Sequence, residues 1–270
     1  MKSLFNRILG KLGFSYTLID QKDLKLITPK YRRKKNIFTA YLQGENIYNF
    51  ISILPIYNAS ISILDLGCGD GCVAASFARN NHKGQYYGFD INNNWIKRIN
   101  SVFLKDENFT FKYIDIFHSY YNKNGKLNST DCDFPLDQKF KFDLIIANSI
   151  FSHMSEMEIE NNLRNCFKYI ADKGKVWCSL YALPNDFKEN KSFDKRFRRY
   201  SECDGYLTFS PWKPQLNMAI YMNNFKEIIE KMGFEIDKYI EGYWYKGKNS
   251  LDQHVQDIFI LSKKKNGGSY

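Results

Sequence analysis

The chain has 270 residues, 44% of them hydrophobic, and a formal net charge of +10. This length fits one large domain or one domain with a cap, and no apolar run approaches the roughly 20 residues that a membrane helix needs. The six cysteines are scattered, which predicts free thiols in a reducing compartment and no metal site. Asn6 and Arg7 interrupt the apolar N-terminal stretch, so we expect a cytoplasmic protein without a signal peptide.

The positive charge permits three kinds of partner: nucleic acid, an anionic membrane surface or a small phosphate-bearing molecule. Two basic runs, residues 30–35 and 191–199, concentrate this charge. Each run is either a solvated segment or a patch that attracts an anionic substrate. Because lysine is abundant throughout the chain, charge alone does not choose among these partners.

Residues 1–57 are predicted to form an N-terminal helical cap. Leu4, Ile8 and Leu12 share one face of a short amphipathic helix within residues 1–13. That helix can pack on the protein body, which we favour, or lie on a membrane surface. A second helix is expected over residues 36–57, where it leads into the first strand.

Residues 61–79 predict a strand, a glycine-rich turn and a helix. Apolar residues dominate the first six positions, as in a buried parallel strand, and Gly67, Gly69 and Gly71 then occur at alternate positions. Glycine adopts positive φ readily and lets a ligand approach the backbone closely. Such a unit opens a nucleotide-binding sheet. Cys72 occupies the sixth position of the dinucleotide pattern G-x-G-x-x-G, so a dinucleotide is not expected.

The pattern that is present, D-x-G-x-G-x-G from Asp65 to Gly71, resembles motif I of class I methyltransferases that use S-adenosyl-L-methionine (SAM). The resemblance implies SAM as the cofactor, held by Asp65 and the three glycines. It also implies an α/β fold: a Rossmann-like seven-stranded sheet, mostly parallel with an antiparallel last strand, and helices on both faces. The methyltransferase domain would span residues 58–262, and residues 263–270 would be a polar tail.

Residues 85–90 are predicted to form the second strand, which ends in Asp90. This acid follows the glycine turn at about the spacing of a ribose-binding carboxylate, and a carboxylate can accept both ribose hydroxyls. Ile91 comes next and would flank the adenine. The alternative role for Asp90 is to cap the helix that follows. With the glycine turn present, we favour the ribose.

Residues 109–116 alternate in polarity as a third strand, and Asp115 lies near its end. A carboxylate at this place can accept a hydrogen bond from the adenine N6 amine, while the backbone N–H of Ile116 can donate to the ring. The alternative is an ordinary loop carboxylate. We favour the adenine contact for Asp115.

A fourth strand is predicted at residues 142–147, after an insertion at residues 117–140 that would shape the acceptor pocket. Ligands of such sheets bind beyond the carboxyl ends of the strands, which places Asn148 at the cofactor and His153 near its reactive end. An imidazole can remove the proton of a hydroxyl acceptor, so His153 is the candidate general base. Its alternative role is structural, as a helix cap or a packed side chain. The weaker candidate bases are His118, His254 and Tyr181.

Three motifs beyond the third strand narrow the resemblance. They are Tyr121-Asn122-Lys123-Asn124-Gly125, Phe134-Pro135 and Ser149-Ile150-Phe151-Ser152-His153-Met154. They are similar to motifs of bacterial class I methyltransferases of the surface-glycan and sugar type, although Lys123 stands where proline is usual in that group. The resemblance runs from about Gly44 to Lys263. It implies a sugar or sugar nucleotide as the acceptor, in capsule or other surface-polysaccharide biosynthesis.

The C-terminal half is predicted to complete the sheet. Its helices and strands are expected at residues 155–170, 175–181, 217–232, 234–240 and 256–261. Ser155 would cap the first of these helices. Residues 182–216 show no clear period and form either a solvated loop or a second insertion at the acceptor. The last two strands have no predicted helix between them and should pair antiparallel.

Four functions remain open from the sequence. The leading hypothesis is an O-methyltransferase for a sugar or sugar nucleotide, because a small anionic acceptor would fit the basic runs. A related one is methylation of a phosphate-type group on a nucleotide-linked precursor. The third is methylation of RNA ribose; base methylation is not expected, since Asn148 is not followed by the two prolines of N-P-P-[YF]. The fourth is a SAM-binding module without transfer, and the intact glycine turn argues against it.

Overall fold

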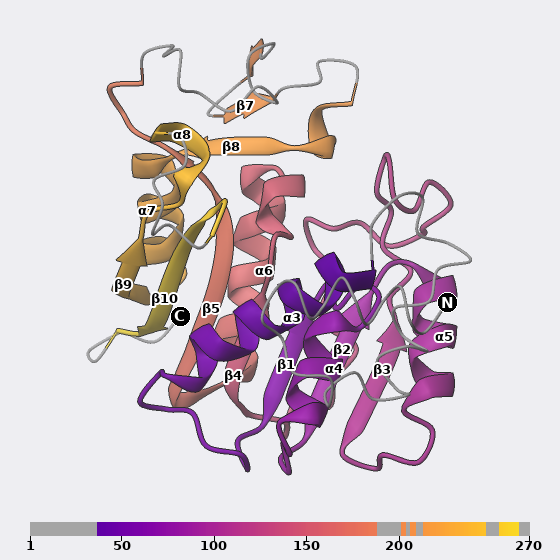
Figure 1. Ribbon diagram of the computed structural model, residues 1–270. Coiled ribbons are helices and arrows are strands. Elements are labelled where there is room, and N and C mark those ends of the chain that lie inside the picture. The colour runs from indigo at the N-terminus through magenta and orange to yellow at the C-terminus, as the bar shows by residue number, and fades with distance from the viewer. Residues whose placement is uncertain (1–36, 188–200, 204–205, 209–212, 247–253, 265–270) are drawn as a thin grey trace.

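The computed structural model describes residues 37–187, 201–203, 206–208, 213–246 and 254–264 (Figure 1). The predicted helix at residues 1–13 and both basic runs lie outside these residues. The α-helices are α3 (Ile37–Ser52), α4 (Cys72–Arg79), α5 (Asn93–Val102), α6 (Glu156–Tyr169), α7 (Met222–Lys231) and α8 (Tyr243–Lys246), and the 3-10 helices are η1 (Phe151–His153) and η3 (Pro214–Leu216). Among the described residues, no helix has the length and apolar character needed to cross a membrane.

The strands are β1 (Ile63–Leu66), β2 (Tyr86–Asp90), β3 (Phe109–Tyr113), β4 (Phe142–Ala147), β5 (Ile170–Leu183), β6 (Ser201–Cys203), β7 (Tyr206–Thr208), β8 (Met218–Tyr221), β9 (Phe234–Ile240) and β10 (Asp257–Lys263). The main sheet has the order β3-β2-β1-β4-β5-β10-β9 (Figure 1). Neighbours from β3 to β5 pair in parallel, and β10 is antiparallel to both β5 and β9. The four-residue helix α8 between β9 and β10 is too short for a parallel crossover. The predicted Rossmann-like sheet with an antiparallel last strand is confirmed.

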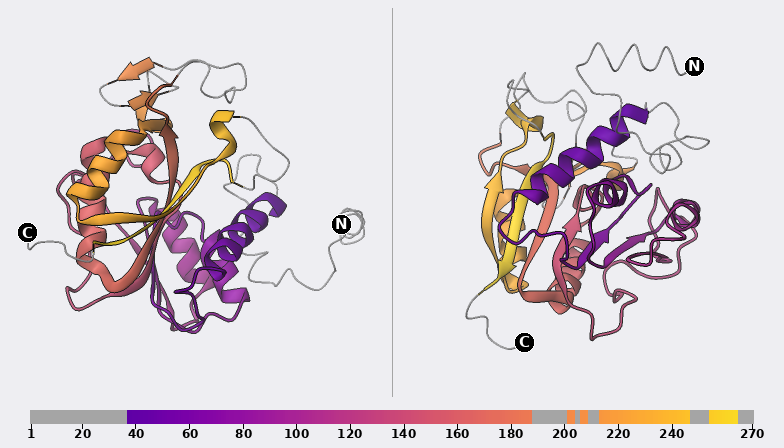
Figure 2. Two further views of the ribbon diagram at one scale, coloured as in Figure 1. Left: turned by 90° about the vertical axis from the view of Figure 1, so that its left-hand side faces the viewer. Right: turned by 60° about the horizontal axis from the view of Figure 1, so that its bottom comes forward.

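Helices cover both faces of this sheet (Figure 2). Along β1, Ile63 packs in a core cluster with side chains of α3, α4 and α5, whereas Leu64 packs in a second cluster with side chains of α6 and α7. Both side chains are fully buried, as a central parallel strand requires. The two clusters place β1 at the centre of the molecule, and the glycine turn follows directly from it.

Three short strands extend the sheet beyond the seven that were predicted. β6 and β7 lie within residues 182–216, the stretch without a clear period. β8 occupies the start of the helix predicted at residues 217–232. That prediction is wrong at its first turn, because α7 begins only at Met222. The physical reason is that β5 continues to Leu183, past the residues that pair with β4 and β10. Its last backbone groups need partners, and β8 pairs with them in parallel.

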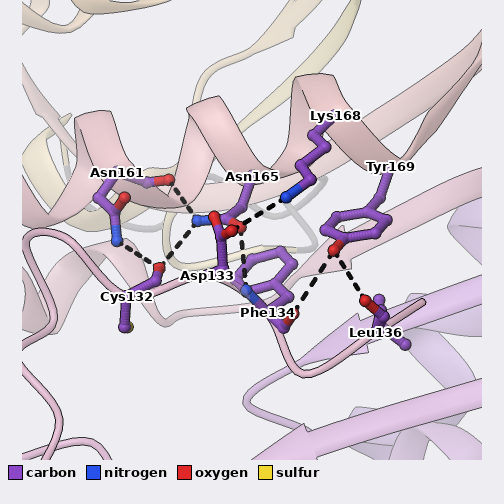
Figure 3. A network of polar contacts seen from close by, with 8 residues as sticks. All are labelled: Cys132, Asp133, Phe134, Leu136, Asn161, Asn165, Lys168 and Tyr169. Atoms are coloured by element: carbon purple, nitrogen blue, oxygen red, sulfur yellow. Dashed lines mark hydrogen bonds and ion pairs between the residues drawn. The ribbon is translucent and has the colours of Figure 1, made fainter. Parts of the chain in front are cut away.

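The insertion at residues 117–140 is fixed to α6 by side-chain hydrogen bonds (Figure 3). The amide of Asn165 donates to the carbonyl of Cys132 at 3.1 Å and accepts the backbone N–H of Phe134 at 3.0 Å. Asn161 donates to the same Cys132 carbonyl at 2.9 Å. Polar side chains of α6 therefore satisfy the backbone of a segment that belongs to no named helix or strand.

α3 lies tightly against α4, which begins directly after the glycine turn. A Cβ atom at Gly44 would lie 2.3 Å from the carbonyl oxygen of Cys72, so the close approach of the two helices requires glycine. The neighbouring Glu45 accepts hydrogen bonds from Ser76 and Arg79 of α4. These contacts hold α3 against α4, beside the glycine turn.

Candidate active site

The glycine turn between β1 and α4 has a backbone shape that other residues rarely adopt. Gly67, Gly69 and Gly71 have φ angles of 64°, 57° and 81°, in the left-handed region that favours glycine. A Cβ atom on Gly67 would lie 2.3 Å from Cγ2 of Ile150. The turn therefore lies against the segment that follows β4, and the carboxyl ends of two adjacent strands meet there.

Asp90 ends β2 and connects the glycine turn to the start of α5. Its Oδ2 accepts the backbone N–H of Gly69 at 2.8 Å, and its Oδ1 accepts that of Asn92 at 2.7 Å. The side chain of Asn92 caps α5, so the alternative in which Asp90 is the cap is wrong. Burial raises the pKa of Asp90 to about 6, although the backbone N–H groups partly offset this rise. Each carboxylate oxygen keeps a lone pair for a ligand hydroxyl.

Asp65 lies deeper in the molecule than Asp90, at the end of β1. Its side chain is 1% exposed, and the hydroxyl of Tyr86 donates to its Oδ2 at 2.6 Å. Burial raises the pKa of Asp65 to about 7, and the hydrogen bond from Tyr86 acts in the opposite direction. The hydrogen bond between this buried carboxyl group and Tyr86 joins the first two strands of the sheet.

The glycine turn, Asp90 and the segment after β4 border a cavity of about 400 Å³, a volume typical of small-molecule sites. Apolar side chains that follow β2 and β3 line it, and so does Asn148, whose Oδ1 accepts the hydroxyl of Ser179 at 3.2 Å. The predicted site residues that line this cavity are Asp65, Gly67, Gly69, Asp90, Ile91, Ile116, Asn148 and His153.

Two predicted cofactor residues do not line the cavity. Gly71 is the residue before α4, and a Cβ atom there would lie 3.1 Å from Ile99, so its role is to let the turn pack on α5. The carboxylate of Asp115 accepts the hydroxyl of Tyr113 at 2.5 Å, away from the cavity wall. The neighbour of Asp115 that does line the wall is Ile116. The contact between Asp115 and adenine stays a prediction, without support from this geometry.

Sequence reasoning gave no role to several other residues of the cavity wall. They include Gln43, Trp95, Tyr121, Met154 and Asn162. Trp95 lies in the first turn of α5, three residues after the helix cap, and its place follows once Asp90 is recognised as the end of β2. Gln43 reaches the wall only because Gly44 lets α3 approach α4. No local pattern marks such a contact between distant segments.

His153 ends η1 and lines the cavity. Its Nδ1 lies 3.1 Å from the carbonyl oxygen of Gln215. A carbonyl only accepts, so Nδ1 is the protonated nitrogen of the neutral ring, and Nε2 carries the lone pair. The pKa of His153 is lowered overall. Burial is the largest cause and His118 adds to it, whereas the carbonyls of Gln215 and Leu216 act in the opposite direction on this pKa. The helix that follows is capped by Ser155, so the capping alternative for His153 is wrong.

His118 lies beside His153 with the opposite arrangement of its nitrogens. Its Nδ1 accepts the backbone N–H groups of Tyr120 and Tyr121, each at 3.1 Å. Nε2 must then carry the proton, and it lies 3.3 Å from the carbonyl oxygen of His153. Both nitrogens of the neutral ring are thus engaged, and burial lowers the pKa of His118. His118 therefore binds the backbone of His153 through its Nε2–H, and it has no ring nitrogen left to remove a proton from a methyl-accepting substrate.

The two other weak candidates for the base lie away from this cavity. His254 lines a separate small cavity beneath α3, where its Nδ1 lies 2.9 Å from the carbonyl oxygen of Gln256. Tyr181 is buried in a third hydrophobic cluster, with its ring 5.2 Å from that of Trp244. Among the described residues, His153 is therefore the candidate base that lines the cavity and has a ring nitrogen besides the one that faces Gln215.

The strand order, the glycine turn and the buried acid at the end of β2 define a class I methyltransferase fold. The sequence profile of the family described as "Methyltransferase domain" matches residues 38–239, which is most of the chain. The chain belongs to this family and is a SAM-dependent methyltransferase.

Solved structures share the fold at low sequence identity. A protein of Pyrococcus horikoshii OT3 has a TM-score of 0.54 and 11% identity over 86% of this chain and 93% of that one. The CcbJ methyltransferase from Streptomyces caelestis has a TM-score of 0.51 and 11% identity over 82% of this chain and 89% of its own. The pyocyanin biosynthetic protein PhzM has a TM-score of 0.53 and 10% identity over 82% of this chain. The chain spans 55% of the length of PhzM. At such identities the likeness concerns the fold.

SAM is the cofactor that this family uses, and the residues of the cavity fit it. The buried carboxylate of Asp90 would accept the ribose hydroxyls, Gly67 and Gly69 would offer the backbone of the turn, and Ile91 and Ile116 would give apolar contact to the adenine. The cofactor supplies a methyl group that is already activated as a sulfonium. The protein has to bind it, orient the acceptor and exclude water.

Proposed function

We propose that this methyltransferase acts on a hydroxyl group of a small molecule, and that the acceptor is a sugar or sugar nucleotide used in capsule or other surface-polysaccharide biosynthesis. The observation that carries the proposal is His153. Its ring lines the cavity, and the carbonyl of Gln215 holds the proton on Nδ1. A hydroxyl acceptor must lose its proton during transfer, and a neutral imidazole with a free Nε2 is suited to remove it.

The reaction follows from the place of His153. Burial lowers the pKa of His153, so the ring is neutral at physiological pH and ready to accept a proton. The acceptor oxygen would bond to the methyl carbon as the carbon–sulfur bond of the sulfonium breaks and the neutral thioether leaves, and Nε2 would take the hydroxyl proton. The ring becomes an imidazolium whose Nδ1–H still donates to the carbonyl of Gln215. Orientation of the acceptor contributes further to the rate.

Exposed tyrosines support a sugar as the acceptor. Tyr121 lines the cavity and is 40% exposed, and the adjacent Tyr120 is 43% exposed. Their rings meet edge to face at a centroid distance of 4.8 Å, and Lys213 Nζ lies 5.2 Å from the centre of the Tyr120 ring. Aromatic faces suit the apolar C–H side of a sugar ring, and an ammonium group nearby suits a phosphate. The motif around Tyr121 also resembles that of surface-glycan methyltransferases.

The proposal favours a small anionic acceptor in the cytoplasm over a polynucleotide. A cavity of about 400 Å³ has the size of a small-molecule site. A polynucleotide would instead require an extended row of cations that contact successive phosphates, and its binding would fall steeply with salt.

The test is to incubate the protein with SAM and a panel of sugar nucleotides, and to search the products by mass spectrometry for the gain of one methyl group. His153→Asn serves as the control, because it keeps a polar side chain without a basic nitrogen. We expect methylation of at least one sugar nucleotide by the parent protein, with strong loss in the variant. Transfer to RNA alone, or to a phosphate oxygen and not a hydroxyl, would refute the proposed acceptor.

A further inference from the structure

Gln215, in the short helix η3, uses its backbone and its side chain at the same time. Its backbone carbonyl accepts the Nδ1–H of His153 at 3.1 Å. Its Oε1 accepts the hydroxyl of Ser119 at 2.6 Å, and its Nε2 lies 3.1 Å and 3.3 Å from the two carboxylate oxygens of Glu158. One residue thus connects η3 to the insertion, to the start of α6 and to the candidate base.

Glu158 is a firm anchor for this residue. Its side chain is buried, and it accepts the backbone N–H of Ser155 at 2.7 Å and the Ser155 hydroxyl at 2.8 Å. The hydroxyl of Ser129, in the insertion, donates to it at 2.5 Å. The carboxylate is therefore held by the first turn of α6 and by the insertion. A glutamine amide that donates to such a group is confined in position, and the carbonyl of the same residue is confined with it.

The two adjacent histidines show what this confinement does. His118 receives two backbone N–H groups on Nδ1 and so carries its proton on Nε2. His153 faces a carbonyl with Nδ1 and so carries its proton there. Without that carbonyl, the Nδ1–H of His153 would lose the acceptor that lies 3.1 Å away and favours the Nδ1–H form. Which nitrogen of His153 carries the proton thus depends on where Gln215 places its carbonyl.

We propose that Gln215 is a positioning residue that holds His153 in the Nδ1–H form and leaves Nε2 as the basic nitrogen in the cavity. The consequence for the reaction rests on the proposed role of His153 as the base. Gln215 touches neither cofactor nor acceptor in this role: it acts through the carbonyl that selects the form of the ring. The side chain matters because Ser119 and Glu158 fix the place of that carbonyl.

The test is nuclear magnetic resonance of the full-length protein with ¹⁵N-labelled histidine, at a pH where the imidazoles are neutral. The chain contains four histidines, and His153→Asn and His118→Asn assign the signals that matter. In the parent protein we expect His153 as the Nδ1–H form and His118 as the Nε2–H form. Gln215→Ala should lower the ratio of Nδ1–H to Nε2–H at His153 roughly fivefold or more, the effect of one ordinary hydrogen bond.

His118 is the internal control, since its partners are the backbone groups of Tyr120 and Tyr121, and it should keep its form in Gln215→Ala. Gln138→Ala, at an exposed glutamine, should change neither ring. Ser119→Ala removes one anchor and should shift His153 in the same direction by less; it decides the question if Gln215→Ala does not fold. Binding of S-adenosyl-L-homocysteine, measured by calorimetry, should be the same in all variants that fold.

A parent protein with His153 as the Nε2–H form would overturn the proposal, and so would a ratio that neither Gln215→Ala nor Ser119→Ala changes. These outcomes are separate from the failure of the proposed function. A shifted ratio together with no methylated sugar nucleotide would keep the role of Gln215 and reject the acceptor. Methylation of a sugar nucleotide with an unshifted ratio would keep the acceptor and reject the role of Gln215.

Discussion

The two sides of the cavity are held together in different ways. On the cofactor side, the glycine turn and Asp90 are fixed by backbone groups, such as the Gly69 N–H that donates to Asp90. On the acceptor side, the positions depend on side chains: Asn165 holds the insertion on α6, and Gln215 reaches Glu158. The first kind of contact needs one acid and the backbone of the glycine turn, whereas the second needs several side chains from separate elements.

The difference also lies in distance along the chain. Asp90 and Gly69 are 21 positions apart, whereas Gln215 and His153 are 62 positions apart. Contacts of the first kind recur wherever a strand, a glycine turn and a second strand follow one another. Contacts of the second kind join segments that lie far apart in the chain. A cofactor site of this sort can be common to a family, while the acceptor site differs between its members.

The largest effect should come from the cofactor side. Asp90→Ala removes both acceptors for the ribose hydroxyls, and each hydrogen bond to a charged group contributes roughly 1.5–3 kcal/mol, so the Kd for S-adenosyl-L-homocysteine should rise roughly 100-fold or more. Isothermal calorimetry measures this change. Melting curves of the ligand-free variant should accompany it, because Asp90 also accepts two backbone N–H groups.

Asp115→Ala is the matched control, since that carboxylate bonds to Tyr113 and lies off the cavity wall. It should leave the affinity nearly unchanged. An equally strong loss in Asp115→Ala would restore the adenine contact that the sequence predicts. An unchanged affinity in Asp90→Ala would remove the ribose role.

On the acceptor side, His153→Asn should lower turnover roughly 100-fold, the usual contribution of a general base, while the affinity for S-adenosyl-L-homocysteine is kept. The methylation assay with the acceptor found in the panel measures this effect. In the parent protein the rate should rise with pH through the lowered pKa of His153 and then level off, and the variant should lack that rise. His254→Asn, in the separate cavity, should behave like the parent. Full activity of His153→Asn would leave orientation alone as the source of catalysis.

Much of the fold could be predicted from the sequence, for reasons seen in particular elements. β4 and α4 were located to the residue because buried strands are continuous apolar runs and because a glycine turn marks the helix start. β8 was missed, since Met218 to Tyr221 is too short to show a period, and only the free end of β5 explains it. The mostly parallel sheet with an antiparallel last strand followed from one motif and one missing crossover helix.

The candidate site likewise contains residues that the sequence predicts and residues that it does not. The glycines and Asp90 were predicted because the local backbone requires them. Gln215 was not, because nothing near it in the sequence indicates that its carbonyl faces His153. Asp115 is a third case: its place after a strand predicts a contact with adenine, and the geometry shows only that its Oδ1 accepts the hydroxyl of Tyr113. A motif specifies where the backbone goes, and side-chain direction depends on neighbours that the motif does not contain.

A smaller effect should separate stability from cofactor binding. Asn165→Ala leaves the backbone N–H of Phe134 without its partner, and an unsatisfied buried group costs roughly 1–3 kcal/mol, so the free energy of unfolding should fall by about 2 kcal/mol. Urea denaturation measures it. Lys168→Ala, which breaks the exposed ion pair with Asp133, is the control and should cost less. Equal losses in the two variants would show that the Asn165 contacts stabilise the protein no more than an exposed ion pair does. A weaker affinity for S-adenosyl-L-homocysteine in Asn165→Ala would show that the two sides are not held independently.

The smallest effect is a pH dependence of cofactor binding, and it differs in sign from the pH dependence of stability. We expect the ribose hydroxyls to donate to the ionised form of Asp90, whose pKa in the ligand-free protein is raised to about 6. Below that pH the carboxyl group is protonated, so the affinity for S-adenosyl-L-homocysteine should fall roughly tenfold between pH 7 and pH 5. Since the folded pKa lies above the ordinary value of 3.8, folding favours the protonated form. The contribution of Asp90 to the free energy of unfolding is therefore fully present below pH 3.8 and is lost as the pH rises through 6.

Loss of affinity at pH 5 is thus not the result of unfolding at this group, and calorimetry at both pH values, with a melting curve at each, distinguishes the two effects. Asp90→Asn should bind weakly at both pH values and show no such dependence. Asp65, whose pKa is raised to about 7, is the other buried acid at the cavity, and it remains in that variant. A tenfold dependence that persists in Asp90→Asn would assign the titration to Asp65, and the ribose would then not require a charged Asp90. Protonation of His153 acts on turnover and not on this affinity, so the cofactor side and the acceptor side should respond to acid separately.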